Sequence, residues 1–316
     1  MIRPLTIVVT CTNRKTTLPS AALQVRTLTS ASVEERAGEW TSRVANDKGP
    51  RTPVRDLYCG EQWQHAMHIA IRAAGRGWAP DMYVASAGLG LLGIEETIPS
   101  YAATFAPYEA DSIAKSAAEL QTWWKALGDA RRNAKLLPAD VTDLVQRRPD
   151  SDYLVVMSGA YLDGLEADLC GAVQSLADPA SMVIVSSGGQ VKSLIAKHVV
   201  SPPAKVQAIL GGARQALNVR AGGWLLGELG PDRFDVGSAA AALKGLADSA
   251  PDLMKFNRKE LGDAEIAAFI RAWADADGPA SASRLLRVLR DRGFACEQKR
   301  FGRLFQACVA GGLDDE

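Results

Sequence analysis

Short apolar runs alternate along most of the chain with segments in which apolar residues recur at helical spacing. The runs cover Leu5–Val9, Asp81–Ser86, Asp152–Ser158 and Met182–Ser186. Each run contains β-branched residues and is bounded by small or polar residues, which is typical of a buried parallel strand. Strands that alternate with helices predict an α/β fold with a mainly parallel, doubly wound sheet.

Helical spacing and turn residues divide the rest of this region. Helices are predicted over Ser32–Ala45, from Trp63 through Arg72, over Glu109–Leu127, Asp140–Gln146 and Gly159–Gln174, and after a turn near Gly211–Asn218. Loops are predicted where glycine and proline gather, at Asn46–Pro53 and Gly227–Asp235, and a linker is expected over the alanine-rich Val236–Pro251. We expect Trp123 and Trp124 to pack in the core, because aromatic rings stabilise mainly by buried area.

The last part of the chain changes in character. Helices are predicted over Leu261–Trp273, after Ser281 as N-cap, and over Gln298–Ala307, with a turn at Gly293. Three short helices with such a turn favour a helix-turn-helix or winged-helix module. We therefore expect an α/β domain over residues 1–235 and a small helical domain over residues 252–312.

Bulk properties narrow the class of protein. A chain of 316 residues suits one large domain and one smaller one, and its 36 basic residues are balanced by 36 acidic ones. Any contact with nucleic acid must then come from a local patch. The five cysteines lack a Cys-x-x-Cys pair, which fits a reducing compartment and argues against a cysteine zinc site. The chain starts without a signal-peptide pattern, and no apolar run approaches the ~20 residues that cross a bilayer, so we expect a cytoplasmic protein without membrane contact.

The polar loop after the first predicted strand is the main candidate site. It reads Thr10-Cys11-Thr12-Asn13-Arg14-Lys15. Open α/β sheets bind ligands past the carboxyl ends of their strands. Asn13 could orient a water, and Arg14 and Lys15 could bind phosphates or an anionic leaving base. The alternative is a solvated loop with two ordinary basic residues.

Two further segments carry candidate pocket residues. Ser86 precedes the small-residue loop that contains Gly88, where the backbone could approach a ligand closely; the alternative is a tight turn. The third glycine of a dinucleotide fingerprint is missing, which excludes a nicotinamide site. The Asp56 carboxylate could assist catalysis, and the Tyr58 ring could stack on a base. Glu61, His65 and His68 share helical spacing, but no second source of metal ligands is evident, and no metal is expected.

Later strand ends and turns offer phosphate contacts. Ser187 and Gln190 follow the fourth predicted strand, and Arg214 follows the glycine pair at Gly211-Gly212. Amides and hydroxyls in such turns could bind phosphate, although ordinary strand-to-helix turns have the same composition.

A basic patch marks the end of the chain. It is interleaved with Phe294 and Phe301 and opposed by only two acidic residues, Asp291 and Glu297. Its members are Arg284, Arg287, Arg290, Arg292, Lys299, Arg300 and Arg303. On a helix-turn-helix module such a patch favours nucleic-acid contact through phosphates, and we select Arg284, Arg287, Lys299, Arg300 and Arg303 for it; the alternative is a solvated or protein-binding face.

The opening loop also carries a resemblance to a known family. Thr-Cys-Thr-Asn-Arg-Lys resembles the Ser-Cys-Ser-x-x-Lys opening of a group that includes peroxide-stress YaaA-like proteins and a domain related to archaeosine synthase. The resemblance continues at Asp56–Tyr58, Ser86–Leu91 and Tyr101–Phe105, and extends loosely to about residue 230. It implies a three-layer fold similar to the uracil-DNA glycosylase superfamily, in which a water-activating Asp or Asn follows the first strand.

Asn13 is the residue that matches this position. Tyr101, in one of the segments that carry the resemblance, is a candidate substrate-binding residue. The chain departs from the pattern at Leu89 and Ala102, and it lacks the Gly-Gln-Asp-Pro-Tyr-His and His-Pro-Ser motifs of the glycosylases. Single-gene anti-phage DNA glycosylases look like relatives.

These observations together predict a DNA glycosylase that removes a modified base from phage DNA, in antiviral defence, and leaves an abasic site. Asn13 and Asp56 would be catalytic, because base loss passes through an oxocarbenium-like sugar that needs a placed water. The substrate would be double-stranded DNA with the modified base flipped out, and no cofactor would be required. The remaining candidate residues would bind the substrate: Cys11, Thr12, Arg14, Lys15, Tyr58, Ser86, Gly88, Tyr101, Ser187, Gln190 and Arg214. The alternatives are a non-catalytic nucleotide or DNA sensor and a transglycosylase that exchanges bases in tRNA or DNA.

Overall fold

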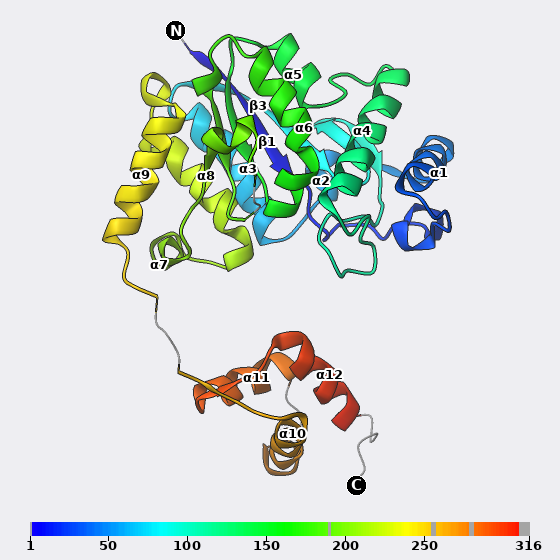
Figure 1. Ribbon diagram of the computed structural model, residues 1–316, viewed down its shortest axis with the longest axis vertical. Coiled ribbons are helices and arrows are strands. Elements are labelled where there is room, and N and C mark those ends of the chain that lie inside the picture. Colours follow the sequence, from blue (N-terminus) through cyan, green and yellow to red (C-terminus); the bar gives the residue numbers. More distant parts are fainter. Residues whose placement is uncertain (1, 189–190, 254–256, 278–280, 310–316) are drawn as a thin grey trace. The chain divides into compact units, whose positions relative to one another are not determined.

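The chain divides into two compact units, with the boundary in the sequence between Pro251 and Asp252. The computed structural model describes residues 2–188, 191–253, 257–277 and 281–309 (Figure 1). No helix in these ranges is both long and apolar enough to span a membrane.

A six-stranded sheet in the order β4-β3-β1-β6-β7-β8 forms the centre of the first unit. Its strands are β1 (Arg3–Thr10), β3 (Trp78–Ser86), β4 (Gly90–Gly93), β6 (Asp152–Val156), β7 (Met182–Val185) and β8 (Val199–Val200). All neighbours pair in parallel except β4, which runs antiparallel to β3. Ile7 lies opposite Met82 on one side and Leu154 on the other, so β1 is central. The predicted α/β class and mainly parallel sheet are confirmed.

Helices cover both faces of this sheet and explain why its strands are continuously apolar. One layer contains α3 (Glu61–Ala74), α8 (Leu217–Glu228) and α9 (Val236–Ser249); the other contains α1 (Val33–Asn46), α4 (Ala117–Asn133), α5 (Val141–Arg147) and α6 (Gly159–Ser175) (Figure 1). The residues of β1 from Leu5 to Thr10 are buried between the layers.

Shorter elements complete the first unit. β2 (Arg51–Pro53) pairs antiparallel with β5 (Thr97–Pro99), where only a loop was predicted. The remaining elements are α2 (Val54–Leu57), α7 (Gln207–Leu210) and 3-10 helices at Ala21–Leu23, Val25–Thr27, Pro179–Ser181, Leu194–His198, Ala204–Val206, Arg214–Ala216 and Pro231–Arg233.

Two further predictions of secondary structure are wrong. The predicted linker Val236–Pro251 is mostly α9, because alanine favours helix and because Ala239, Leu243 and Ala247 form a buried stripe at four-residue spacing. The helix predicted from Glu109 begins only at Ala117. Ser116 and Glu119 form a capping box there, and this fixes the start of α4.

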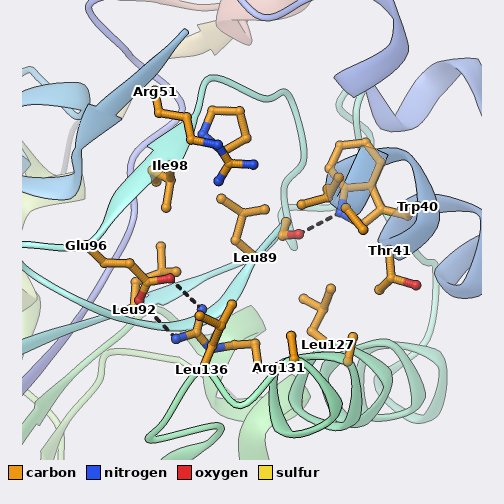
Figure 2. Close-up of a pocket in the computed structure, with 16 residues that line it drawn as sticks. Trp40, Thr41, Arg51, Leu89, Leu92, Glu96, Ile98, Leu127, Arg131 and Leu136 are labelled. Atoms are coloured by element: carbon orange, nitrogen blue, oxygen red, sulfur yellow. Dashed lines mark hydrogen bonds and ion pairs between the residues drawn. The ribbon is translucent and has the colours of Figure 1, made fainter. Parts of the chain in front are cut away.

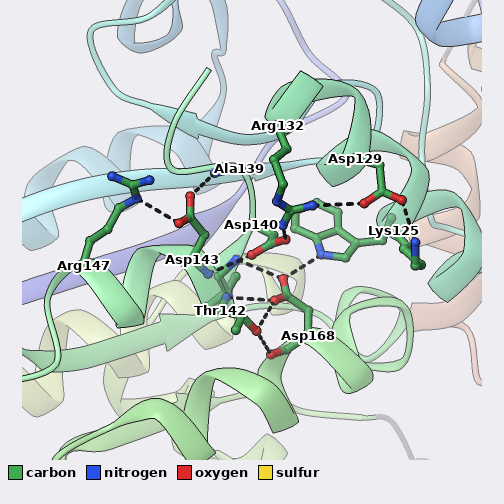
Figure 3. A network of polar contacts seen from close by, with 11 residues as sticks. Lys125, Asp129, Arg132, Ala139, Asp140, Thr142, Asp143, Arg147 and Asp168 are labelled. Carbon is green, nitrogen blue, oxygen red and sulfur yellow. Dashed lines mark hydrogen bonds and ion pairs between the residues drawn. The ribbon is translucent and has the colours of Figure 1, made fainter. Parts of the chain in front are cut away.

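A half-buried carboxylate, that of Asp168, joins α4, α5 and α6 (Figure 3). The side chain of Asp168 accepts hydrogen bonds from the Trp124 indole at 2.8 Å, the Val141 N–H at 3.0 Å and the Thr142 N–H at 2.8 Å. Burial raises the pKa of Asp168, while these hydrogen bonds favour its charged form. Trp123 donates to the Ala87 carbonyl at 2.8 Å, and both tryptophans are buried, as predicted.

The second unit contains three helices around its own apolar core. They are α10 (Asp263–Asp277), α11 (Ala282–Asp291) and α12 (Gln298–Val309), and β9 (Lys259–Glu260) pairs in parallel with β10 (Phe294–Ala295). The Ser281 side chain caps α11, as predicted. The core consists of Ile266, Ile270, Leu285, Leu286, Leu289, Cys296, Phe301 and Leu304.

Candidate functional site

A pocket of about 650 Å³ lies at the carboxyl ends of β1, β6 and β7. Counted in chain order, the parallel strands are arranged 2-1-3-4-5. In this doubly wound order the ligand site falls between the first and third strands, where the outgoing connections diverge. Thr10 and Cys11 after β1, and Met157 and Ser158 after β6, line the pocket at that position. The loop after the first strand therefore does line a pocket.

Backbone contacts hold this loop against the segment that leads into α3. The Cys59 N–H donates to the Arg14 carbonyl at 3.0 Å, and the Thr12 hydroxyl lies 3.2 Å from the Cys59 carbonyl. The exposed side chains of Asn13 and Arg14 remain on the pocket wall. Among the described residues, the Asn13 amide has no hydrogen-bond partner, so it is available to a ligand.

Three helices begin at the pocket without a side-chain cap. Gly60, Ser158 and Ala216 are the N-cap residues of α3, α6 and α8, and none caps through its side chain. Elsewhere, the N-cap side chains of α1, α4, α5, α9 and α11 each accept a helix N–H: Ser32, Ser116, Asp140, Asp235 and Ser281. The first N–H groups of a helix lack internal partners and carry partial positive charge. The ends of α3 and α6 thus present donors at one pocket, whereas the Leu217 N–H at the start of α8 already donates to the Arg214 carbonyl.

Charged side chains add to this preference for anions. Arg14 and Arg214 are exposed at the pocket, without an ion pair to another described residue. The Glu61 carboxylate pairs with Arg220 and accepts the Ala213 N–H at 3.2 Å. The hydrogen bond from Arg220 lowers the pKa of Glu61, which therefore stays ionised and paired.

The sequence did not single out several residues that shape the pocket. The Asn218 side chain donates to the Met157 carbonyl at 2.8 Å and accepts the Ser187 N–H at 3.1 Å, so it joins the ends of β6 and β7. Tyr161 lines the pocket with its hydroxyl 3.0 Å from the Cys11 sulfur. Ser158 lies two residues after the end of β6, as Ser187 does after β7, and the same pattern in the sequence could have identified it. Gln190 lies outside the described residues.

The tyrosine and serine candidates lie beneath the loop, not in the pocket. The Tyr101 hydroxyl is 2.6 Å from the Ser86 hydroxyl and 2.8 Å from the Tyr58 hydroxyl, and all three side chains are buried. Burial raises the pKa of both tyrosines. The Lys15 ammonium lies 4.2 Å from the centre of the Tyr101 ring, and burial lowers its pKa. The side chains of Lys15, Tyr58, Ser86 and Tyr101 do not line this pocket. Their contacts with one another instead stabilise the packing around the β1 loop.

Asp56 and Gly88 are also placed away from the pocket. Asp56 belongs to α2, whose Val54 and Leu57 are buried, and this turns the Asp56 carboxylate to solvent, 3.6 Å from Arg55 Nε. Gly88 lines a second, smaller pocket. The structure therefore brings Cys11, Thr12, Asn13, Arg14, Ser187 and Arg214 together at one pocket.

The histidines of α3 make other contacts. His68 Nδ1 lies 2.7 Å from the Gln64 carbonyl, and burial lowers the pKa of His65. In the ranges that the structure describes, no group of three His, Cys, Asp or Glu side chains could hold a metal ion.

The basic residues of the second unit divide into two sets. Arg284 and Arg287 are exposed on α11. On α12, Arg300 forms an ion pair with Asp263 at 2.5 Å, and Arg303 lies 3.6 Å from the same carboxylate. Lys299 is exposed on α12. One acidic side chain therefore offsets part of the α12 charge.

Comparison of the chain with protein-family models, with curated proteins and with solved structures found no match.

Proposed function

We propose that the pocket beside β1 and β6 binds a phosphate-bearing nucleotide unit of DNA and hydrolyses its N-glycosidic bond, releasing a modified base. The observation that carries the proposal is the meeting of two uncapped helix ends, those of α3 and α6, with two exposed arginines at one pocket. Helix N-termini bind phosphate through free N–H groups and the helix dipole, and arginine binds it in a bidentate manner. The volume of the pocket, about 650 Å³, also fits a nucleotide, because pockets of about 300–1,000 Å³ hold ligands of that size.

Asn13 supplies the chemistry of the proposal. Its free amide on the pocket wall positions a water against C1′ of the sugar. The water oxygen forms a bond to C1′ while the C1′–N bond breaks, and the electron pair leaves with the base, which takes a proton from solvent. The proton lost by the water passes to a carboxylate. We assign that role to Glu109, a carboxylate that lines the pocket. Asp56, turned to solvent, receives no catalytic role.

The fold supports this proposal at the level of architecture. Helices on both faces of a mainly parallel sheet, with Asn13 after the first strand, agree with the three-layer arrangement expected for a relative of the uracil-DNA glycosylases. Within the second unit, the helix pair α11 and α12 would act as a helix-turn-helix reader, with Arg284 and Arg287 as phosphate contacts.

The test uses purified full-length protein and duplex oligonucleotides that carry different modified bases. Base release is followed by mass spectrometry of the small product and by alkaline cleavage at the abasic site. Asn13→Ala should lower the rate about 100-fold or more, since groups that place a water or stabilise charge contribute on that scale. Asn133→Ala, at an exposed position on α4 away from the pocket, is the matched control.

The other outcomes identify the alternatives. Binding without base release from any substrate would indicate a sensor. Incorporation of a labelled free base would indicate exchange. Full activity of Asn13→Ala would remove Asn13 from the mechanism.

A further inference from the structure

A second pocket in the first unit, of about 180 Å³, shares no lining residue with the first. It lies between α1, α4 and the strands β4 and β5 (Figure 2). Its walls are mainly apolar and include the ring of Trp40. The other large apolar side chains of the wall are Leu89, Leu92, Ile98, Leu127 and Leu136.

Most polar groups of this pocket are already engaged. Arg131 and Glu96 form a two-fold ion pair, with both N···O distances at 2.9 Å, and so neutralise each other. The Trp40 indole donates to the Gly88 carbonyl at 2.6 Å, which fixes the plane of its ring. Among the buried side-chain atoms that line this pocket in the described residues, Arg131 Nε lacks a hydrogen-bond partner.

Arg51 is the exception. It comes from β2, is exposed, and makes no ion pair or side-chain hydrogen bond with another described residue. Figure 2 shows its guanidinium pointing toward the apolar side chains that line the pocket. The pocket thus combines apolar walls with one uncompensated positive charge. That combination is complementary to a small molecule with an apolar body and a single negative charge.

We propose that this pocket binds a small amphipathic carboxylate, with its ring or branched alkyl body against Trp40 and Leu127 and its carboxylate on Arg51. The size fits, because an apolar cavity of about 150 Å³ holds a benzene ring. A nine-atom probe such as benzoate should bind with a Kd on the order of 1 mM, within the usual limits of affinity per atom. This site is separate from the proposed glycosidase pocket and does not depend on that function.

The test is a titration of full-length protein with benzoate and with benzamide, its neutral isostere, followed through the Trp40 indole N–H resonance. Benzoate should shift this resonance saturably and bind more tightly than benzamide. Arg51→Gln should weaken benzoate about two- to fivefold, the usual range for a solvent-exposed ion pair, and leave benzamide unchanged. Ala130→Leu, which fills the pocket from α4, should abolish both.

Arg76→Gln, at an exposed arginine that does not line the pocket, is the matched control and should change neither ligand. Because Arg51 is exposed, its variant should fold normally, and it carries the test even if Ala130→Leu is unstable. The proposal is overturned if neither probe gives a saturable shift of Trp40, or if benzoate binds wild type and Arg51→Gln equally.

Discussion

The Glu61 carboxylate on α3 pairs with the Arg220 guanidinium on α8 and also accepts the Ala213 N–H. One side chain thus connects the start of α3 to the turn that precedes α8, across one wall of the candidate site. The pair is solvent-accessible, so its main effect is on the shape of the pocket.

The first prediction concerns pH. The hydrogen bond from Arg220 lowers the pKa of Glu61 below its ordinary value of 4.5, so the pair contributes fully above that value and is lost as the pH falls through the lower folded-state pKa. Glu61→Gln should therefore lower the melting temperature at pH 7 and have a smaller effect near pH 3. Glu119→Gln, which removes another carboxylate with a lowered pKa at the capping box of α4, is the positive control and should show the same dependence on pH. An equal effect of Glu61→Gln at both pH values would show that the pair does not titrate as described.

The second prediction concerns the uncapped helix ends. Inorganic phosphate should raise the melting temperature more than chloride of equal ionic strength, because a ligand at ten times its Kd stabilises the folded state by about 1.4 kcal/mol. Ser158→Asp should cap α6 and stabilise the protein by about 0.5–1 kcal/mol without ligand.

The same variant should weaken the response to phosphate, since its carboxylate repels the ligand and takes up the N–H donors. Arg214→Gln should weaken that response without stabilising the protein. An unchanged response in both variants would place the phosphate elsewhere.

The third prediction concerns two glycines. A Cβ at Gly88 would lie 2.5 Å from the Tyr101 ring and 3.2 Å from the Trp40 ring, so Gly88→Ala should destabilise the protein by about 1–3 kcal/mol. Gly38 lies within α1 with no atom within 4 Å of an added Cβ, and Gly38→Ala should stabilise by about 0.5–1 kcal/mol. Urea unfolding of both variants measures the difference. Equal stabilities would mean that the Tyr101 ring moves aside freely.

The fourth prediction concerns the second unit. The double variant Arg284→Gln and Arg287→Gln should weaken binding of non-specific DNA and reduce the salt slope by about 2, since each phosphate contact contributes about 0.9. Arg300→Gln should leave the slope almost unchanged, because Asp263 already pairs with that guanidinium. Fluorescence anisotropy at several salt concentrations measures both. A larger loss of slope for Arg300→Gln would make α12 the phosphate-binding helix.

The fold was predictable where one rule decides the structure. Leu5–Val9 and Met182–Ser186 are apolar except for Thr6 and Ser186, and such short runs with β-branched residues favour a strand buried between helical layers. The start of α4 was missed because its apolar spacing extends upstream, while the Ser116 cap decides the boundary.

The place of the candidate site in the fold was easier to predict than the residues that form it. Asn13 and Ser187 follow directly from strand ends, and the sheet brings such ends together. Tyr58 and Tyr101 have residue types that suit a pocket equally well, yet three-dimensional packing turns their hydroxyls toward each other under the loop. Asn218 lies on helix α8, and no local sequence pattern predicts that its side chain contacts the residues after β6 and β7.

The contacts of the β1 loop have a mechanical consequence. Lys15 bridges Tyr58, and the Cys59 N–H holds the Arg14 carbonyl, so the loop and the entrance of α3 shift as one piece. Another wall of the pocket, formed by residues 213–216, comes directly after Gly211 and Gly212. Both glycines have a left-handed backbone conformation, with φ of 72° and 67°. Because the Ala213 N–H that follows these glycines donates to Glu61 at the start of α3, we expect this wall to keep its position relative to Asn13.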